Sequence, residues 1–176
     1  MTMLNLFKKS PDPEAVLAVY RAIVAQSRQP VFYAQWGVPD TVTGRFDVLS
    51  LHMGLVFRRL GGTGKPATEF SQALFDLFFK DMDRNLREMG AGDLSVPKKI
   101  RNMGNLFYGL ATSLNEAMER GDRAETEAVL RRNLFDNAEG PNVAALADYL
   151  EAEYARLKLQ TVEAVIGGTV KLGEAA

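Results

Sequence analysis

The chain has 176 residues, of which 47% are hydrophobic and 24% charged, and its formal net charge is −1. A chain of this size and composition is long enough to fold as one domain with a core of its own, and the balanced charge gives no global electrostatic reason to expect DNA as a partner. The absence of cysteine excludes disulfides, thiolate metal sites and cysteine nucleophiles.

The sequence shows no export signal and no membrane-spanning segment. Residues 1–16 place their apolar side chains before two lysines and lack the long apolar stretch of a secretory signal. No apolar run approaches the roughly 20 residues that a membrane-spanning helix needs. We therefore expect a cytoplasmic protein whose contact with a membrane is peripheral.

The first half of the chain predicts two helices separated by a loop. Asp12 followed by Pro13 is a favoured helix start, and apolar residues with a 3.6-residue period continue to about Gln26. Prolines and glycines around the single tryptophan, Trp36, then predict a loop with at most one short helical turn. Residues 43–60 return to helical spacing and are apolar nearly all round, which predicts a central helix.

The second half predicts four more helices. A long helix covers residues 66–89, and Ser95 is placed to cap the next one, which continues to about Arg120. Asp122, with Glu125 three residues later, resembles a capping box. The six main helices are expected at about 12–26, 43–60, 66–89, 95–120, 122–135 and 142–166.

These patterns predict an all-α fold, because no segment alternates with period two for long enough to indicate a strand. We expect a single domain of about six helices, packed as an irregular bundle over residues 12–166. Residues 1–11 are expected to be a flexible N-terminal segment and residues 167–176 a flexible tail.

The carboxylates of residues 76–88 allow two interpretations. An isoprenoid or lipid carrier, or an all-α enzyme, would use a deep apolar pocket beside Asp76, Asp81 and Asp83. Metal binding would require a second carboxylate-rich helix opposite the first, and the chain has none, so we expect no metal. The other interpretation is a solvated face with ion pairs between residues four apart.

Asp81 and Glu88 fall inside the apolar arc of that helix. An unpaired carboxylate is costly to bury, so two arrangements remain. Both residues pair with the basic start of the following helix, "PKKIR" at residues 97–101, or this end of the helix faces solvent or a partner.

His52 is the only histidine and lies in the apolar stretch "LSLHMGL". We expect a hydrogen-bonded core residue. With neither a second histidine nor a cysteine, an acid–base or nucleophilic site is hard to assemble, so we expect a protein that is not an enzyme and holds no cofactor.

Lys98, Lys99 and Arg101 form a short basic cluster at a predicted helix start. One interpretation is a solvated face. The other is contact with an anionic membrane surface or with ribosomal RNA, where each basic residue contributes about 1 kcal/mol near an anionic membrane.

Four segments in order carry a family resemblance: "LSLHMGLVFRRL", "FFKDMD", "MGAGDLSVPKKIRNMGNLFYG" and "NLFDN". With these segments the chain resembles the ubiquinol–cytochrome c chaperone family over about residues 33–155. It departs from the family at Leu114 and Asn115, where many members have Tyr and Asp, while Glu116 matches.

The resemblance implies an assembly chaperone that binds newly made cytochrome b of the respiratory bc complex, peripheral to the inner membrane, with a second assembly factor as a further possible partner. Such a client requires an exposed apolar surface with a polar rim. Burial in the core is the competing interpretation for each apolar residue taken singly. The partner-binding residues that we expect are Phe78, Phe79, Asp81, Met82, Asp83, Arg84, Met89, Lys98, Lys99, Met103 and Glu116.

Overall fold

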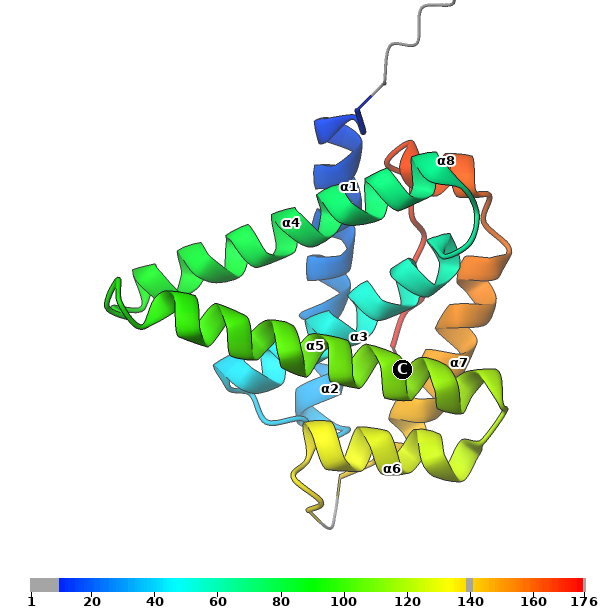
Figure 1. Cartoon of the computed structure of the whole chain (residues 1–176). Coiled ribbons are helices and arrows are strands. Elements are labelled where there is room, and N and C mark those ends of the chain that lie inside the picture. Colours follow the sequence, from blue (N-terminus) through cyan, green and yellow to red (C-terminus); the bar gives the residue numbers. More distant parts are fainter. Residues whose placement is uncertain (1–9, 139–140, 176) are drawn as a thin grey trace, which may run out of the picture.

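The computed structural model describes residues 10–138 and 141–175. Its helices are α1 (Pro13–Ser27), α2 (Val31–Ala34), α3 (Val42–Leu60), α4 (Lys65–Glu88), α5 (Val96–Glu119), α6 (Arg123–Leu134), α7 (Val143–Lys158) and α8 (Val162–Ile166) (Figure 1). No strand occurs in these residues, and the all-α fold is confirmed. Residues 1–9, most of the expected N-terminal flexible segment, lie outside the described residues.

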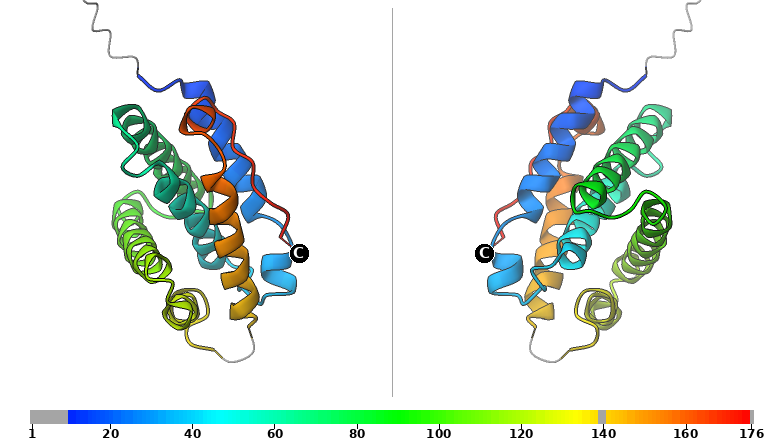
Figure 2. Two further views of the ribbon diagram at one scale, coloured as in Figure 1. Left: turned by 90° about the vertical axis from the view of Figure 1, so that its right-hand side faces the viewer. Right: turned by 90° about the vertical axis from the view of Figure 1, so that its left-hand side faces the viewer.

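The centre of the domain is α3. Every residue from Phe46 to Val56 is buried, which confirms the prediction from its apolar sequence. α3 contacts α1, α4, α5, α6 and α7. Two views, each turned by 90° from that of Figure 1, show α4 and α5 on one side of α3 and α1 and α7 on the other (Figure 2).

Local capping residues explain where most helices begin. The side chains of Asp12, Thr41, Asp122 and Asn142 each accept a hydrogen bond from a backbone N–H of the first helical turn that follows. The prediction for Ser95 was wrong, because its own backbone is already helical and its hydroxyl donates to the Gly92 carbonyl at 2.8 Å. Ser95 therefore stabilises the turn before α5 and does not cap that helix.

The last predicted helix, residues 142–166, is divided in the structure. α7 ends at Lys158, and α8 begins after Thr161. The backbone of Thr161 is extended, and its hydroxyl accepts a hydrogen bond from the Ala164 N–H at 3.1 Å. The apolar period continues across the break, so periodicity alone could not reveal it.

The C-terminal residues also differ from the frayed tail that we expected. Residues 169–175 lie along α1 and α7, and their main chain is hydrogen-bonded to Gln29, Glu153 and Gln160. The partners lie 11, 20 and 146 residues away along the chain, so no local pattern indicated them.

The two longest helices, α4 and α5, have 24 residues each and form a hairpin. In the described part of the chain, no helix is both long and apolar enough to cross a bilayer.

Candidate functional site

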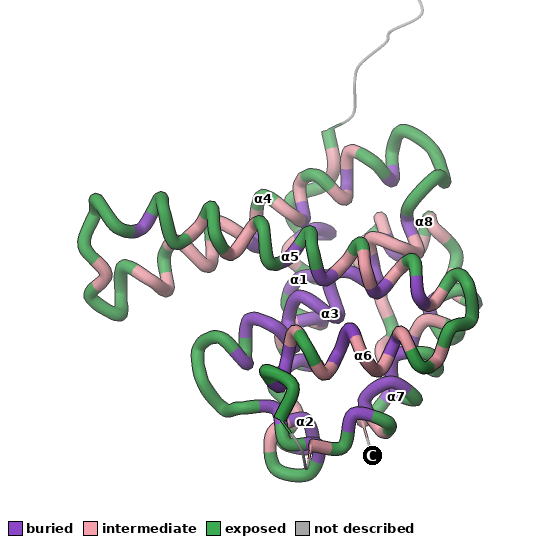
Figure 3. The backbone as a smooth tube through the Cα atoms, turned by 60° about the horizontal axis from the view of Figure 1, so that its bottom comes forward, coloured by how far each residue is buried: buried purple, intermediate pink, exposed green. Residues whose placement is uncertain are grey.

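A helical hairpin projects from the body of the domain. Its end consists of the last turns of α4, the linking turn and the first turns of α5, residues 79–104, which we call the arm (Figures 1 and 3). Within the arm only Val96 is fully buried. Met89 is 62% exposed and Leu94 is 98% exposed, so the tip presents large apolar side chains to solvent.

The expected partner-binding residue Phe78 lies just inside the base of the arm and is completely buried. Its ring stacks on Phe46 with centroids 5.6 Å apart and meets Phe107 edge-on at 5.8 Å. Phe78 is therefore a core residue and does not belong to a binding surface. The sequence showed an apolar residue at this position, but helical periodicity could not show which apolar residues of the helix stay exposed.

Three other expected residues occupy intermediate positions. Phe79, Met82 and Met103 are partly buried and pack against the core. The Phe79 ring lies 4.7 Å from that of Phe75, which fixes it against the body of the domain. Met82 differs from the other two because it also lines a cleft.

The cleft, of about 340 Å³, lies where the ends of α1 and α4 meet the start of α3. Its apolar lining is Val24, Val42, Phe46, Leu49, Met82 and Met89. Its polar lining includes Arg28, Arg45, Asp81, Asn85 and Glu88. An apolar surface with charges of both signs around it suits an amphipathic polypeptide segment.

Asp81 lies at the boundary between the cleft and the core. The Tyr20 hydroxyl donates to Asp81 Oδ2 at 2.8 Å, and the Arg84 guanidinium pairs with Oδ1. The Asp81 side chain is 19% exposed. Burial, followed by the hydrogen bond to Asp81 and the charge of Asp81, raises the pKa of Tyr20. The hydroxyl therefore stays protonated as the donor that a half-buried carboxylate requires.

This arrangement corrects the expected pairing with the next helix. Asp81 and Glu88 both pair with Arg84, the latter at 3.8 Å, and not with the basic start of α5. Lys98 and Lys99 are exposed. The partners of these two carboxylates are thus on α4 itself and on α1, and the start of α5 keeps its cations at the surface.

The aspartates of α4 do not converge. Asp83 pairs with Arg87 at 2.6 Å, and Asp76 accepts a hydrogen bond from Gln72 at 2.8 Å. Of the three aspartates that the carrier interpretation placed beside one pocket, only Asp81 lines the cleft. Among the residues that the structure describes, no group of three or more His, Asp or Glu side chains is arranged to hold a metal ion.

The basic cluster Lys98, Lys99 and Arg101 lies exposed on the first turns of α5, close in sequence to exposed Leu94. Glu116 is exposed too, but it lies 18 residues further along the same helix, about 27 Å from Lys98 at 1.5 Å per residue. The structure therefore brings the cations to the arm and leaves Glu116 away from it.

Sequence reasoning missed several surface residues. Val42 and Leu94 are exposed apolar residues outside the predicted stripes, and Tyr108 is 57% exposed although its ring lies 5.5 Å from Phe75. Arg28 and Arg45, which line the cleft, come from separate helices. For Leu94 the sequence did offer a signal of exposure, because a large apolar residue stands in the glycine-rich turn "GAGDL".

His52 has the structural role that we expected. It is 1% exposed, its Nδ1 lies 2.8 Å from the Val48 carbonyl, and its Nε2 lies 2.8 Å from the Tyr149 hydroxyl. Because the Val48 carbonyl can only accept, Nδ1 carries the proton and Nε2 accepts from Tyr149. Burial lowers the pKa of His52 to about 4, so the ring is neutral.

The fold and the site together define an all-helical protein with an open amphipathic cleft beside a projecting hairpin. The chain belongs to the family described as "Ubiquinol-cytochrome C chaperone", which matches residues 34–172. The resemblance stated from the sequence is thereby confirmed.

The chain is also similar to two further proteins. The "Ubiquinol-cytochrome-c reductase complex assembly factor 1" of Xenopus laevis is 22% identical over 153 residues, covering 87% of this chain and 74% of the frog protein. The crystal structure of the Cbp3 homolog from Brucella abortus is 36% identical, with a TM-score of 0.84, and covers 92% of this chain and 90% of that one.

Proposed function

We propose that this protein is an assembly chaperone that binds newly made cytochrome b and assists the biogenesis of ubiquinol–cytochrome c reductase. Family membership and the name of the frog relative support the assembly role. The single structural observation that carries the client-binding part is the cleft, with Met82 and Met89 in its apolar lining and charged side chains beside them.

The chemistry of the cleft suits a client that is not yet folded. Methionine side chains are flexible and polarisable, so Met82 and Met89 adapt to apolar segments of irregular shape. Arg28, Arg45 and Glu88 keep the surrounding surface hydrated, which favours a soluble state of the free chaperone. Such a surface binds and releases by affinity alone, and we propose that it acts without catalysis and without a cofactor.

The exposed cations of α5 support a peripheral location of this protein. In this proposal Lys98, Lys99 and Arg101 approach the anionic surface of the inner membrane or of a ribosome, while the adjacent arm and cleft receive the client. Each cation contributes about 1 kcal/mol near an anionic membrane surface. We propose a second assembly factor as a further partner of this protein.

The test is recovery of cytochrome b with the tagged protein from cells lysed in a mild detergent, measured by quantitative mass spectrometry. Val42→Glu and Met89→Lys place single charges in the apolar lining at exposed positions, so the fold is expected to tolerate both. We expect each to lower cytochrome b recovery at least about tenfold, equivalent to about 1.4 kcal/mol.

The matched control is Leu106→Lys, since Leu106 is also an exposed apolar residue, at 54%, but does not line the cleft. Its recovery of cytochrome b should match the unaltered protein. Equal recovery with all three variants would refute the client-binding role of the cleft. Co-purification of a small isoprenoid or lipid in place of cytochrome b would favour the carrier.

A further inference from the structure

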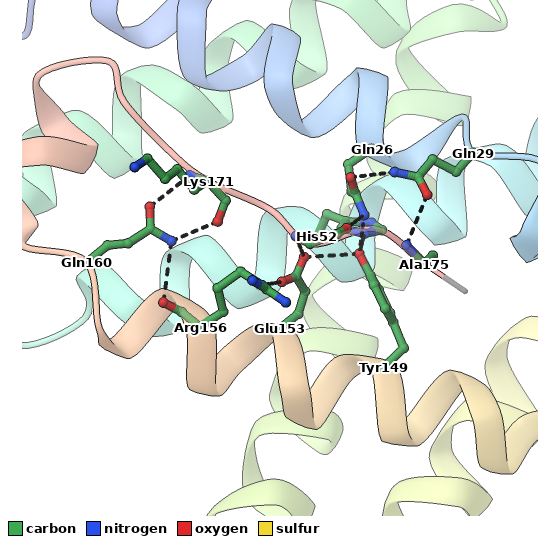
Figure 4. Close-up of polar contacts among 10 residues, drawn as sticks. Gln26, Gln29, His52, Tyr149, Glu153, Arg156, Gln160, Lys171 and Ala175 are labelled. Atoms are coloured by element: carbon green, nitrogen blue, oxygen red, sulfur yellow. Dashed lines mark hydrogen bonds and ion pairs between the residues drawn. The ribbon is translucent and has the colours of Figure 1, made fainter.

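The C-terminal tail, residues 169–175, lies along α1 and α7 (Figures 2 and 4). We call the surface that binds its main chain, formed by Gln26, Gln29, Glu153 and Gln160, the tail groove. Gln160 binds both main-chain groups of Lys171, since its Nε2 donates to the Lys171 carbonyl and its Oε1 accepts from the Lys171 N–H, each at 2.8 Å. One residue of the tail is therefore held at both of its backbone groups by one side-chain amide.

Main-chain contacts also occur at Gly173, through both of its groups, and at Ala175, through its N–H alone. Glu153 Oε2 accepts from the Gly173 N–H at 2.7 Å, and Gln26 Nε2 donates to the Gly173 carbonyl. Gln29 Oε1 accepts from the Ala175 N–H at 3.1 Å. In an extended chain, alternate residues direct their backbone groups to the same side. Side chains of α1, of α7 and of the residues that follow these helices thus supply the contacts that a neighbouring β-strand would otherwise make.

The polar groups that hold the tail are connected to the core. Gln29 donates to Gln26 at 2.8 Å, Gln26 donates to the Tyr149 hydroxyl at 2.7 Å, and Tyr149 contacts His52. Such a network fixes the direction of each amide. The tail groove is therefore a preformed set of side-chain donors and acceptors that bind the main chain of a segment.

Some side chains of the tail contribute to its recognition. Lys171 and Glu174 are exposed, whereas Val170, Leu172 and Ala175 are partly buried and pack against the core. One position is restricted, because a Cβ on Gly173 would approach the Arg156 guanidinium to 2.6–2.8 Å. That guanidinium is occupied by the Glu153 carboxylate, with Nε and Oε1 2.8 Å apart. The tail groove thus favours an extended segment with glycine at its centre.

The tail fills this region incompletely. A cavity of about 740 Å³ remains between the tail and the helices, lined in part by Ala22, Ala25, Leu159 and Val170. Leu159, beside this cavity, is 88% exposed. A segment held by main-chain contacts, next to unfilled space, is one that a competing segment can displace.

We propose that the tail groove is a binding site for an extended segment of another polypeptide, with glycine at the central position, and that the tail occupies it as an intramolecular substitute. Addition of a strand through main-chain hydrogen bonds is a general mode of peptide recognition. The occupant is defined by the main-chain pattern and the central glycine. This inference goes beyond the proposed function and does not depend on cytochrome b as the client.

The experiment measures binding of a fluorescent peptide, Thr-Val-Lys-Leu-Gly-Glu-Ala, to the full chain by fluorescence anisotropy. Gly173→Pro removes the N–H that Glu153 binds and releases the tail, while every side chain of the tail groove is unchanged. We expect this variant to bind the peptide at least about tenfold more tightly than the unaltered protein.

Glu174→Pro is the matched control, because Glu174 is exposed and its amide donates no hydrogen bond among the described residues. It should bind the peptide as weakly as the unaltered protein. A peptide with proline in place of its glycine should bind to none of the three proteins. Hydrogen exchange of the Lys171 and Ala175 amides reports whether Gly173→Pro has released the tail.

A measurement without any variant keeps the proposal testable if Gly173→Pro fails to fold. Excess peptide added to the unaltered chain should accelerate exchange of the Gly173 amide, since the peptide displaces the tail. A released tail without peptide binding would overturn the proposal. So would a dimer, detected by light scattering, in which copies exchange tails and exclude the peptide. Because cytochrome b is absent from these assays, their failure is distinct from failure of the proposed function.

Discussion

The body and the arm use polar residues in opposite ways. In the body, the polar side chains of α1, α3 and α7 are hydrogen-bonded to one another across long sequence separations, as in the contacts of Tyr149 with His52 and with Gln26. In the arm, ion pairs join residues three to six positions apart, such as Asp83 with Arg87. The body therefore fixes the fold, and the arm keeps its surface adaptable.

The apolar residues differ in the same sense. The α3 segment from Phe46 to Val56 is buried without interruption, whereas the arm has one fully buried residue and exposes Met89 and Leu94. Exposed ion pairs contribute only about 0–1 kcal/mol each. We therefore expect mutations in the core of the body to change stability and mutations in the arm to change binding.

The largest expected effect is at Phe78, where the arm joins the body. Phe78→Ala should lower the free energy of unfolding by about 3–5 kcal/mol, because a completely buried ring stacked on Phe46 is removed. Urea unfolding followed by circular dichroism measures it. Met89→Ala in the arm should change stability by less than about 0.5 kcal/mol. Similar losses for both variants would contradict the division into body and arm.

Asp47 is a buried carboxyl group on α3, and burial raises its pKa to about 7. Because the unfolded chain ionises near 3.8, its contribution to stability is present at low pH and is lost as the pH rises through about 7. Asp47→Asn should therefore stabilise the protein at pH 8 by up to about 4 kcal/mol. The gain should disappear near pH 4 when unfolding is repeated there, and a gain independent of pH would disprove the assignment.

His52 should oppose Asp47. Its folded pKa of about 4 lies below the unfolded value of 6.5, so its contribution is present above pH 6.5 and is lost as the pH falls toward 4. In the Asp47→Asn background, where the opposing group is removed, stability should fall by about 3 kcal/mol over this window. A flat profile in that background, measured by thermal unfolding in matched buffers, would show that His52 is not buried in its neutral form.

A smaller effect is expected at the boundary between the two regions. Tyr20→Phe removes the hydroxyl that donates to Asp81 and leaves a half-buried carboxylate with one partner fewer. We expect a loss of about 1 kcal/mol at pH 7. Urea unfolding of both proteins at pH 7 measures the loss. An unchanged free energy of unfolding would contradict this role of the hydroxyl.

The features that the sequence predicted correctly are local ones. The caps at Asp12 and Asp122 and the central position of α3 follow from residues within one or two turns. The cleft and the tail groove are assembled from helices far apart in the chain, so Arg45 and Gln160 carry no local signal of their roles. Phe78 and Met89 illustrate the same limit. Phe78 lies on α4 and Met89 directly follows that helix, but where the hairpin leaves the body decides which of these two apolar residues is buried.

The central claim is that the cleft and the arm receive the client while the surface of the body away from the cleft does not. Its most direct test is site-specific photo-cross-linking in cells, with the reactive amino acid placed at Val42, at Met89 or, as a control, at exposed Arg132 on α6. We predict cross-links to newly made cytochrome b from positions 42 and 89 and none from position 132. Cross-links of equal yield from all three positions, or none from the two cleft positions, would contradict the claim.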